Sequence, residues 1–368
     1  MMTVPFVDLK AQYQSIKGDI DEAIRQVIET TAFIRGPFVQ KFEQEFAELY
    51  GIKHCVSVAN GTDAIYIVFK MLGIGAGDEV ITVANSWISS SETIGQTGAT
   101  PVFVDVDEYF TIDVAHIESK ITARTKAILP VHLYGQMADM DALQDLCKRH
   151  KLHLIEDCAQ SHFSAYRGKR AGTFGLAATI SFYPGKNLGA YGDAGAILTN
   201  DDALAEKCRM YANHGALKKH QHLMQGINSR LDGLQAAILS AKLPHILEWT
   251  KLRQQKATYY QEVLAGIPQI TLPQVRPHTE HTWHLYVILA EQRDELAEFL
   301  QTQGIETAIH YPVPLPFMPA YAHLGGTTTD FPAVAQNQPR ILSLPIYPEL
   351  SNTQMDAVAK GIRQFYGA

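Results

Sequence analysis

The first 50 residues of the chain carry a helical pattern of hydrophobic positions. In residues 10–30 and again in residues 38–50, apolar side chains recur three and four positions apart, which is the spacing of one helix face. The same pattern returns in shorter segments at residues 62–73, 86–97, 139–150 and 201–213. We therefore expect amphipathic helices over all of these segments.

Short apolar runs alternate with these helical segments. They read HCVSVAN, EVITVAN, TPVFVDV, KAILPVHLYG, LHLIEDCA, ATISFYP and GAILTN, and turn residues bound them. Near-continuous apolar runs separated by helices are typical of a mostly parallel sheet that helices cover on both faces. The pattern predicts an α/β domain, in which ligands gather at the carboxyl ends of the strands.

The pattern changes in the last third of the chain. Residues 228–262 read as one long helical stretch, which we expect Pro244 to interrupt. A strand in HTWHLYVIL, a helix in RDELAEFLQTQ, a proline-rich loop at 311–319 and a helix at 352–366 follow. These elements predict a large α/β domain over residues 1–245 and a smaller C-terminal α+β domain over residues 246–368.

Composition excludes several classes of protein. The net charge of −7 and the thin spread of basic residues predict no nucleic-acid partner. The sequence has no apolar run of membrane-spanning length and no signal peptide, so we expect no membrane association and a cytoplasmic location. The cysteines form no C-x-x-C pair and are expected to be reduced core thiols: Cys55, Cys147, Cys158 and Cys208.

One lysine stands inside a glycine-rich stretch, TISFYPGKNLGAYGDAGAILTN, at residues 179–200. The apolar strand before Lys186 and the tight turns at Gly185 and Gly189 would bring this lysine into a cleft. A desolvated lysine loses part of its preference for the charged form and can form a Schiff base with a carbonyl. An aldolase uses the same chemistry, and an ordinary surface loop is the structural alternative.

Asp157 in LIEDCAQSHF separates these possibilities. It ends an apolar strand, where a carboxylate that faces the interior needs a cation or a hydrogen-bond donor. The ring nitrogen of pyridoxal phosphate is such a cation, and the aspartate keeps it protonated. A helix cap or a loop hydrogen bond is the alternative for Asp157 alone, but its pairing with Lys186 favours the cofactor.

Two strand-to-helix junctions offer further contacts for such a cofactor. In SVANGTDAIYIVFK, Gly61, Thr62 and Asp63 open a helix, whose free amides can bind a phosphate. A plain helix cap explains the same residues equally well. In NSWISSSE, Trp87 offers an aromatic ring for one face of the cofactor, with a buried core position as the alternative.

With these motifs, the chain resembles the sugar aminotransferases of the DegT/DnrJ/EryC1/StrS family, within the fold type I pyridoxal-phosphate enzymes. The similarity runs from PFVDLKAQY through ANGTDA, GDEVI, LYGQ, EDCAQ, SFYPGKNLGAYGDAGA and NSRLDGLQAAIL to HYPVPL and SLPIYP. It implies a mostly parallel seven-stranded sheet flanked by helices, a smaller α+β domain, and a homodimer with shared active sites.

The resemblance implies a role for each matching residue. Lys186 would carry the cofactor, and Asp157 would pair with its ring nitrogen. The other implied cofactor contacts are Gly61, Thr62 and Ser181 at the phosphate, Trp87 on the ring, Gln160 near the phenolic oxygen, and Asn228 at the phosphate of the neighbouring subunit's cofactor.

The resemblance also implies the reaction. Some members carry histidine in place of Lys186 and act as sugar dehydratases, so the lysine indicates transamination. We expect a ping-pong transfer from L-glutamate, with Lys186 as general base and acid. The stretch FYPGKNLGAYGDAGA is more similar to members that aminate a 3-oxo nucleotide sugar, here a dTDP-linked 6-deoxyhexose, which places Tyr183, His310 and Tyr311 at the substrate. A core-edge position is the equal alternative for His310.

Several other functions remain alternatives. A 4-oxo nucleotide-sugar aminotransferase, perosamine-type or acting on a UDP-sugar, comes next, followed by a UDP-3-oxo sugar aminotransferase and a non-catalytic binding protein for pyridoxal phosphate. A nicotinamide oxidoreductase is disfavoured because no G-x-G-x-x-G follows the first strand. His220 and His222 have no acidic partner close in sequence, so we predict no metal site. With Lys218 and Lys219 beside them, contact with a nucleotide diphosphate is favoured over a metal, and solvated side chains are the alternative.

Overall fold

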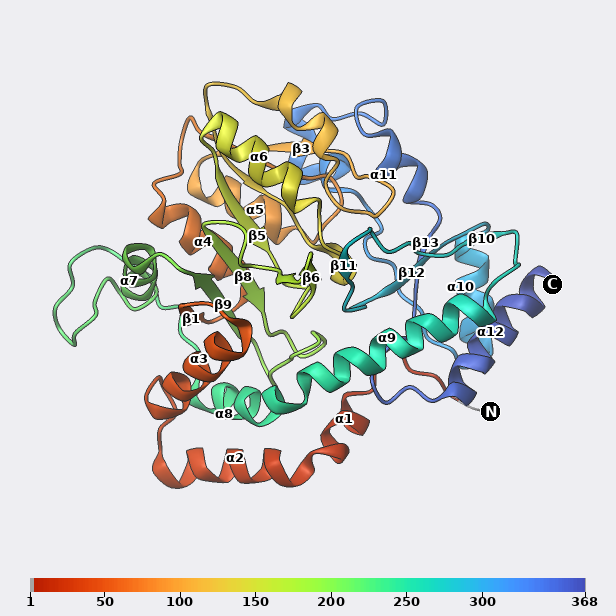
Figure 1. Ribbon diagram of the computed structural model, residues 1–368, viewed down its shortest axis with the longest axis horizontal. Helices are drawn as coiled ribbons and strands as arrows, with labels where there is room; N and C mark the ends of the chain where they lie inside the picture. The colour runs from red at the N-terminus through yellow and green to blue at the C-terminus, as the bar shows by residue number, and fades with distance from the viewer. Residues whose placement is uncertain (1–2, 368) are drawn as a thin grey trace.

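The computed structural model describes residues 3–367, and a seven-stranded sheet lies at its centre (Figure 1). The strand order is β1-β9-β8-β5-β4-β2-β3. Strand β9 is antiparallel to both neighbours, and the remaining pairs are parallel, which confirms the predicted mostly parallel sheet. The strands are β1 (His54–Val58), β2 (Glu79–Val83), β3 (Thr100–Val104), β4 (Thr125–Leu129), β5 (His153–Asp157), β8 (Ala177–Ser181) and β9 (Gly195–Thr199).

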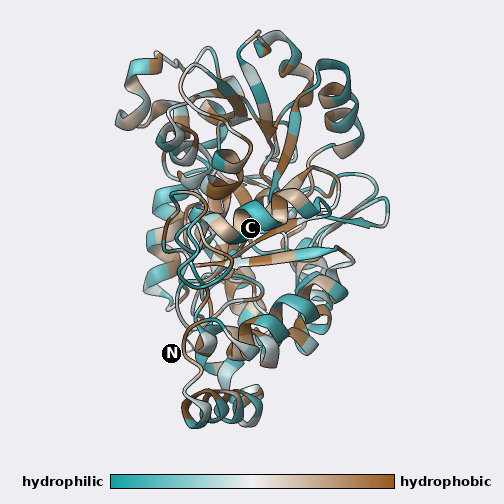
Figure 2. Cartoon of the chain, turned by 90° about the vertical axis from the view of Figure 1, so that its left-hand side faces the viewer, coloured by the Kyte–Doolittle hydropathy of each residue, from teal (hydrophilic) through white to brown (hydrophobic). Residues whose placement is uncertain are grey.

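Helices cover both faces of this sheet, as the apolar runs predict. One face packs against α4 (Gly61–Met71), α5 (Ser89–Thr97) and α7 (Asp202–Tyr211). The other packs against α3 (Pro37–Tyr50), α6 (Met140–His150) and α8 (Gly233–Lys242). Figure 2 shows the hydrophobic strands enclosed between helices that carry hydrophilic residues. Because both faces are covered, β2 and β9 are buried at every position.

Two long helical segments of the sequence are interrupted in the structure. The segment 10–30 contains α1 (Leu9–Ser15) and α2 (Lys17–Thr30), which meet at Ile16. The stretch 228–262 becomes helical only at Gly233, where α8 begins. A 3₁₀ turn over Leu243–His245 then separates α8 from α9 (Ile246–Val263). Pro244 lies in this turn, which confirms the predicted interruption.

The C-terminal part has a hydrophobic core of its own. An antiparallel sheet of β10 (Ile270–Thr271), β12 (Tyr286–Ala290) and β13 (Ile341–Leu344) packs with α9, α10 (Arg293–Thr302) and α12 (Asn352–Tyr366). Leu315, Tyr321 and Phe331 pack instead into the core of the large sheet. The C-terminal chain therefore crosses back over the large domain, and the division after residue 245 stays a prediction.

Short elements complete the described chain. A small sheet joins β11 to β6 and β7, so the C-terminal part also contacts the loop that follows β5. These elements are β6 (Ala165–Tyr166), β7 (Lys169–Arg170), β11 (Thr279–Glu280), α11 (Pro332–Asn337), and 3₁₀ turns at Val114–His116, Glu118–Lys120, Leu133–Gly135, Leu315–Phe317 and Pro319–Leu324.

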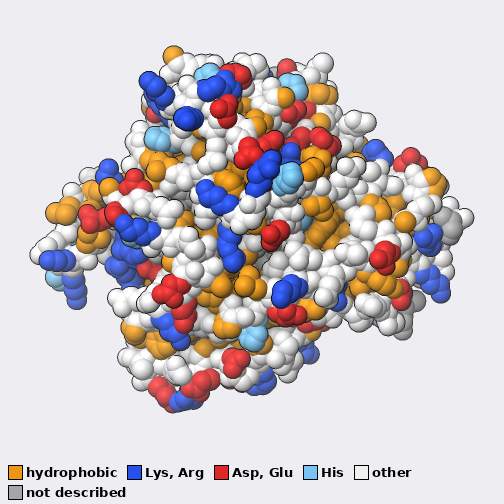
Figure 3. Space-filling view, in the orientation of Figure 1, with side chains coloured by type: hydrophobic (Ala, Val, Ile, Leu, Met, Phe, Trp, Pro, Cys, Tyr) orange, Lys and Arg blue, Asp and Glu red, His pale blue; other side chains and the backbone are white. Residues whose placement is uncertain are grey.

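The surface and the cysteines agree with the composition. Acidic and basic side chains are interspersed over the face in Figure 3. All four cysteines are free and buried, which confirms the expected core thiols. Within residues 3–367, no helix has the length and apolar character needed to cross a membrane.

Candidate active site

A cavity of about 550 Å³ lies where several strands of the large sheet end. Residues that follow β1, β2 and β4, and the last residues of β5 and β8, form one side of it. The C-terminal part contributes Arg253, His284 and Ile346 to the other side. The cavity brings together every site residue predicted from the sequence except Asn228: Gly61, Thr62, Trp87, Asp157, Gln160, Ser181, Tyr183, Lys186, His310 and Tyr311.

Asp157 ends β5 and is only 4% exposed. Its Oδ2 accepts a hydrogen bond from the Ser90 hydroxyl at 2.9 Å, and its Oδ1 accepts one from the Ala159 N–H at 3.1 Å. Burial raises the pKa of this carboxyl, and the hydrogen bonds and the charge of Lys186 oppose the effect. No ion pair to Asp157 occurs among residues 3–367, so a cation bound in the cavity would stabilise the carboxylate.

Lys186 lies in the tight turn that follows β8. Its N–H donates to the carbonyl of Tyr183 at 2.8 Å. At Gly189 a Cβ atom would lie 2.3 Å from the Pro184 carbonyl oxygen, so the turn requires glycine there, whereas Gly185 has room for a side chain. The buried Lys242 donates from Nζ to the Gly189 carbonyl at 2.7 Å and ties the turn to α8.

The surroundings of Lys186 favour a reactive amine. Burial lowers the pKa of Lys186 to about 8, and the charge of Asp157 opposes this shift. A larger fraction of the side chain is then neutral near physiological pH than for an exposed lysine. Neutral amine is the form that attacks a carbonyl or accepts a proton.

The first turn of α4 forms another part of the cavity lining. Asn60 caps the helix, because its Oδ1 accepts the N–H of Asp63 at 2.8 Å. A Cβ atom at Gly61 would lie 2.8 Å from Cβ of Ser181, so glycine lets the helix start approach the end of β8. The Thr62 hydroxyl lies 2.7 Å from that of Ser89. Amides and hydroxyls therefore converge as an anion site requires.

A model of the DegT/DnrJ/EryC1/StrS aminotransferase family matches residues 14–363 of the sequence. The chain belongs to this family. The aminotransferases of the family depend on pyridoxal phosphate, so this aminotransferase uses the same cofactor. The fold type I architecture expected from the sequence is thereby confirmed.

Individual relatives align with the aminotransferase from end to end. A pleiotropic regulatory protein of Geobacillus stearothermophilus is 46% identical over 99% of this chain and 99% of its own. The dTDP-3-amino-3,4,6-trideoxy-α-D-glucose transaminase of Streptomyces venezuelae is 45% identical over 98% of this chain and 96% of its own. The crystal structure of S. venezuelae DesV in complex with a ketimine intermediate has a TM-score of 0.97 and 44% identity, with complete coverage (100%) of both chains.

The cavity fits pyridoxal phosphate on structural grounds. Asp157 is a buried carboxylate without an ion-pair partner in the described part of the chain, as a protonated ring nitrogen requires. The start of α4, held against Ser181 by Gly61, offers amides to a phosphate. Lys186 lines the same cavity, so its amine would be available to the carbonyl of a cofactor bound there.

Aromatic and polar side chains surround this position. Trp87 is 60% exposed with its ring centre 5.7 Å from that of Tyr311, so the buried-core alternative for Trp87 is wrong. Gln160 accepts the N–H of Tyr134 at 2.8 Å and donates to the Tyr311 hydroxyl at 2.9 Å. Both ends of its amide are therefore engaged and its orientation is fixed.

The sequence did not point to every residue of the cavity. Ser90, which donates to Asp157, stands in the serine run SSSE, but nothing in that run distinguishes it from its neighbours. Arg253 lies in the middle of α9, where its charge alone predicts an exposed side chain. Asn228 lies in a loop, paired with Asn213 in a β-bridge, and it is not among the residues that line the cavity of its own chain.

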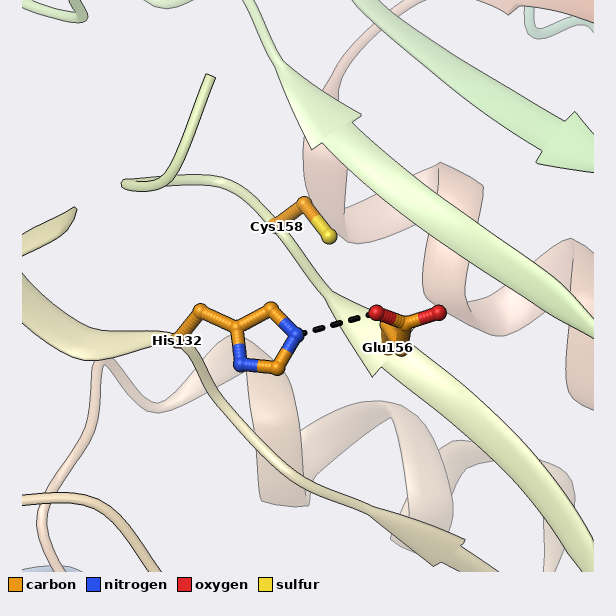
Figure 4. A group of neighbouring side chains, drawn as sticks. All are labelled: His132, Glu156 and Cys158. Atoms are coloured by element: carbon orange, nitrogen blue, oxygen red, sulfur yellow. Dashed lines mark hydrogen bonds and ion pairs between the residues drawn. The ribbon is translucent and has the colours of Figure 1, made fainter. Parts of the chain in front are cut away.

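A second buried cluster occupies the opposite face of β5. Figure 4 shows His132, Glu156 and Cys158, which have the spacing of metal ligands. His132 accepts the Ala138 N–H at Nδ1, so its proton lies on Nε2, 3.1 Å from Oε2 of Glu156. Glu156 also accepts the backbone N–H groups of Gly172, Phe174 and Gly175 at 2.7–2.8 Å. His132 and Glu156 therefore use their ligand atoms in hydrogen bonds within the protein, as parts of a structural network.

Proposed function

We propose that this aminotransferase moves the amino group of L-glutamate to C3 of a dTDP-linked 3-oxo-6-deoxyhexose. The observation that carries the proposal is the shared cavity in which Lys186 and Asp157 meet Tyr183, His310 and Tyr311. The 45% identity to a transaminase named for a dTDP-3-amino sugar supports both the nucleotide and the ring position. The amino donor follows from the implied family chemistry.

Each residue has a defined task in this proposal. Bound pyridoxal phosphate supplies an electron sink for the carbanion that forms at the donor's Cα. Asp157 would hold the ring nitrogen, while Gly61, Thr62 and Ser181 would hold the phosphate. Lys186 takes the proton from Cα, and its pKa of about 8 suits this exchange near neutral pH. Trp87 would cover the ring, and Gln160 would contact its phenolic oxygen.

The sugar enters past residues of both parts of the chain. Tyr183 is 59% exposed at the cavity, where its hydroxyl can meet the diphosphate or hexose. His310 places Nδ1 2.8 Å from the Ser343 hydroxyl, and burial lowers the pKa of His310 to about 4. This histidine is therefore neutral at physiological pH and offers hydrogen bonds to a sugar rather than charge.

Separate incubations with two sugars test the ring position. The enzyme, loaded with cofactor, is given L-glutamate and either the dTDP-3-oxo- or the dTDP-4-oxo-6-deoxyhexose, and NMR locates the new amine. We expect amination at C3 alone, with no product from Lys186→Ala. Amination of only the 4-oxo sugar would overturn the position, and turnover of neither sugar would contradict the proposed substrate.

We also propose that the enzyme is a homodimer in which Asn228 contacts the phosphate of the partner's cofactor. The position of Asn228 outside its own cavity supports this arrangement. The segment after α7 projects from the body in Figure 1, and its Leu223 is 75% exposed, which suits burial against a second copy. The neighbouring Lys218 and Lys219 would then face the partner's substrate.

Subunit mixing tests the shared site. Lys186→Ala and Asn228→Ala subunits are each expected to have little activity alone. In a mixed dimer with shared sites, one site combines an intact Lys186 with an intact Asn228, so activity returns. No recovery in verified mixed dimers would show that each chain completes its own site.

A further inference from the structure

Arg253 is a buried cation in the wall of the cavity. It lies on α9, the long helix that connects the two parts of the chain in Figure 1, and it is 5% exposed. Its Nη1 donates to the carbonyl oxygens of Trp283 at 3.1 Å, His284 at 3.4 Å and Ile346 at 2.8 Å. These bonds fix one end of the guanidinium against the C-terminal part.

The other edge of the guanidinium makes no hydrogen bond to the described part of the chain. An arginine has five N–H donors, and those of Nε and Nη2 lie parallel on one edge. Residues 3–367 offer neither atom a hydrogen-bond acceptor. Both atoms are partly accessible, because neither is among the fully buried side-chain atoms that lack a hydrogen-bond partner. Since Arg253 lines the cavity, this edge of the guanidinium faces its open space. Two parallel N–H groups match the two oxygens of a carboxylate.

The charge of Arg253 is also unmatched within the described chain. It forms no ion pair there, and Glu349 influences it only from beyond contact distance. Burial lowers the pKa of Arg253 to about 10, which reflects the cost of this uncompensated position. An anionic ligand in the cavity would relieve it.

Arg253 lies close to the reactive lysine. His284 connects them, because its carbonyl accepts from Arg253 and its ring Nδ1 lies 3.1 Å from Oδ1 of Asn187, the residue after Lys186. The charges of Lys186 and Arg253 both lower the pKa of His284, beside the larger effect of burial. Both cations therefore act on the same imidazole, and both line the same cavity.

We propose that the Nε and Nη2 edge of Arg253 binds a carboxylate of the amino donor and selects an amino acid over a simple amine. This inference rests on the proposed function, since it assumes a glutamate-like donor. With the carboxylate held at Arg253, the donor's amino group lies toward Lys186. Arg253 is thus a specificity residue at a defined subsite for an α-amino acid.

The test combines changes in the protein with changes in the ligand. The cofactor-loaded wild type is compared with Arg253→Lys, which keeps a charge and donors for the carbonyls, and with Arg253→Met. Lys251→Met is the matched control, because it removes an exposed charge from the same helix, 3.9 Å from Glu248. Calorimetry measures the binding of glutarate, and the cofactor's absorbance reports the reaction with L-glutamate, L-glutamine and L-isoglutamine.

We expect Arg253→Lys to weaken glutarate binding about tenfold or more, because a bidentate charged contact is lost, and Lys251→Met to leave it unchanged. Arg253→Lys should react more slowly than wild type with L-glutamate, and this difference in rate should be absent with one of the two amides. Loss of the penalty with L-isoglutamine assigns the α-carboxylate, and loss with L-glutamine assigns the side-chain carboxylate. Both results support the subsite.

Other outcomes overturn the inference. Unchanged glutarate binding in Arg253→Lys, or an equal penalty for all three donors, would show that Arg253 only holds the backbone together. If Arg253→Met fails to fold, Arg253→Lys still decides, because its thermal unfolding and cofactor absorbance are checked first. A wild type that binds cofactor and ignores L-glutamate would instead refute the proposed function.

Discussion

Glu156 and Asp157 are neighbouring acidic residues on β5 that differ in how many hydrogen bonds they accept. Glu156 is fully buried and receives four hydrogen bonds, two at each oxygen, from three backbone N–H groups and His132. Asp157 is almost as buried and receives one hydrogen bond at each oxygen, from Ser90 and Ala159. The difference is that the protein supplies all the hydrogen-bond donors that Glu156 needs, whereas Asp157 still has acceptor positions that face the cavity.

The comparison separates a structural acid from a functional one. Burial alone does not distinguish them, since both residues are almost completely inaccessible to solvent. What distinguishes them is the number of hydrogen bonds that each accepts from the protein, because a carboxylate whose acceptor positions are all filled has none left for a ligand. The same reasoning distinguishes Arg253, with one free edge, from Lys242, whose amine is held by the Gly189 carbonyl and lies 4.2 Å from the Tyr191 ring centre.

Exchange of Asp157 for asparagine gives the largest expected effect on turnover. In the proposed site, the variant loses the charge that would pair with the cofactor's ring nitrogen. A broken buried pair costs about 3 kcal/mol or more, which corresponds to a rate loss of about a hundredfold. Its free energy of unfolding without cofactor should change little. Steady-state kinetics and urea denaturation check both statements, and a variant with near wild-type turnover would remove Asp157 from the site.

Glu156→Gln should produce the reverse result. Whichever oxygen becomes an amide nitrogen, two of the four donors lose their acceptor, which costs about 2–5 kcal/mol of unfolding free energy. The folded enzyme should keep its turnover within a few-fold, because Glu156 faces away from the cavity. Urea denaturation and kinetics at low temperature measure the two quantities. A large loss of turnover without loss of stability would contradict the structural role.

The smallest effect is a difference in pH dependence. The pKa of Asp157 is raised by burial above its unfolded value, so its contribution to stability is present at low pH and is lost as the pH rises through the folded pKa. In cofactor-free protein, the stability of wild type relative to Asp157→Asn should therefore fall as the pH rises from the ordinary carboxyl pKa of about 4 through the higher folded pKa. Urea midpoints of the two proteins give this difference, and parallel curves would show that Asp157 is already stabilised by the protein.

Much of the architecture follows from local patterns. The seven apolar runs became the seven strands of the large sheet, and Pro244 separates α8 from α9, because both signals act within a few residues. The start of one helix differs from the prediction: the helix expected from residue 86 begins at Ser89, which leaves Trp87 exposed at the cavity. The family motifs located Lys186 and Asp157, and the structure places them around one cavity.

The sequence by itself determined the alternation of strands and helices, the family, and therefore the cofactor. Only the tertiary structure decided which partners each charged group receives. Ser90 reaches Asp157 from α5, and the backbone carbonyls of Trp283, His284 and Ile346 fix Arg253 from distant parts of the chain. Such contacts depend on how separate elements pack, and no periodicity within one element encodes them.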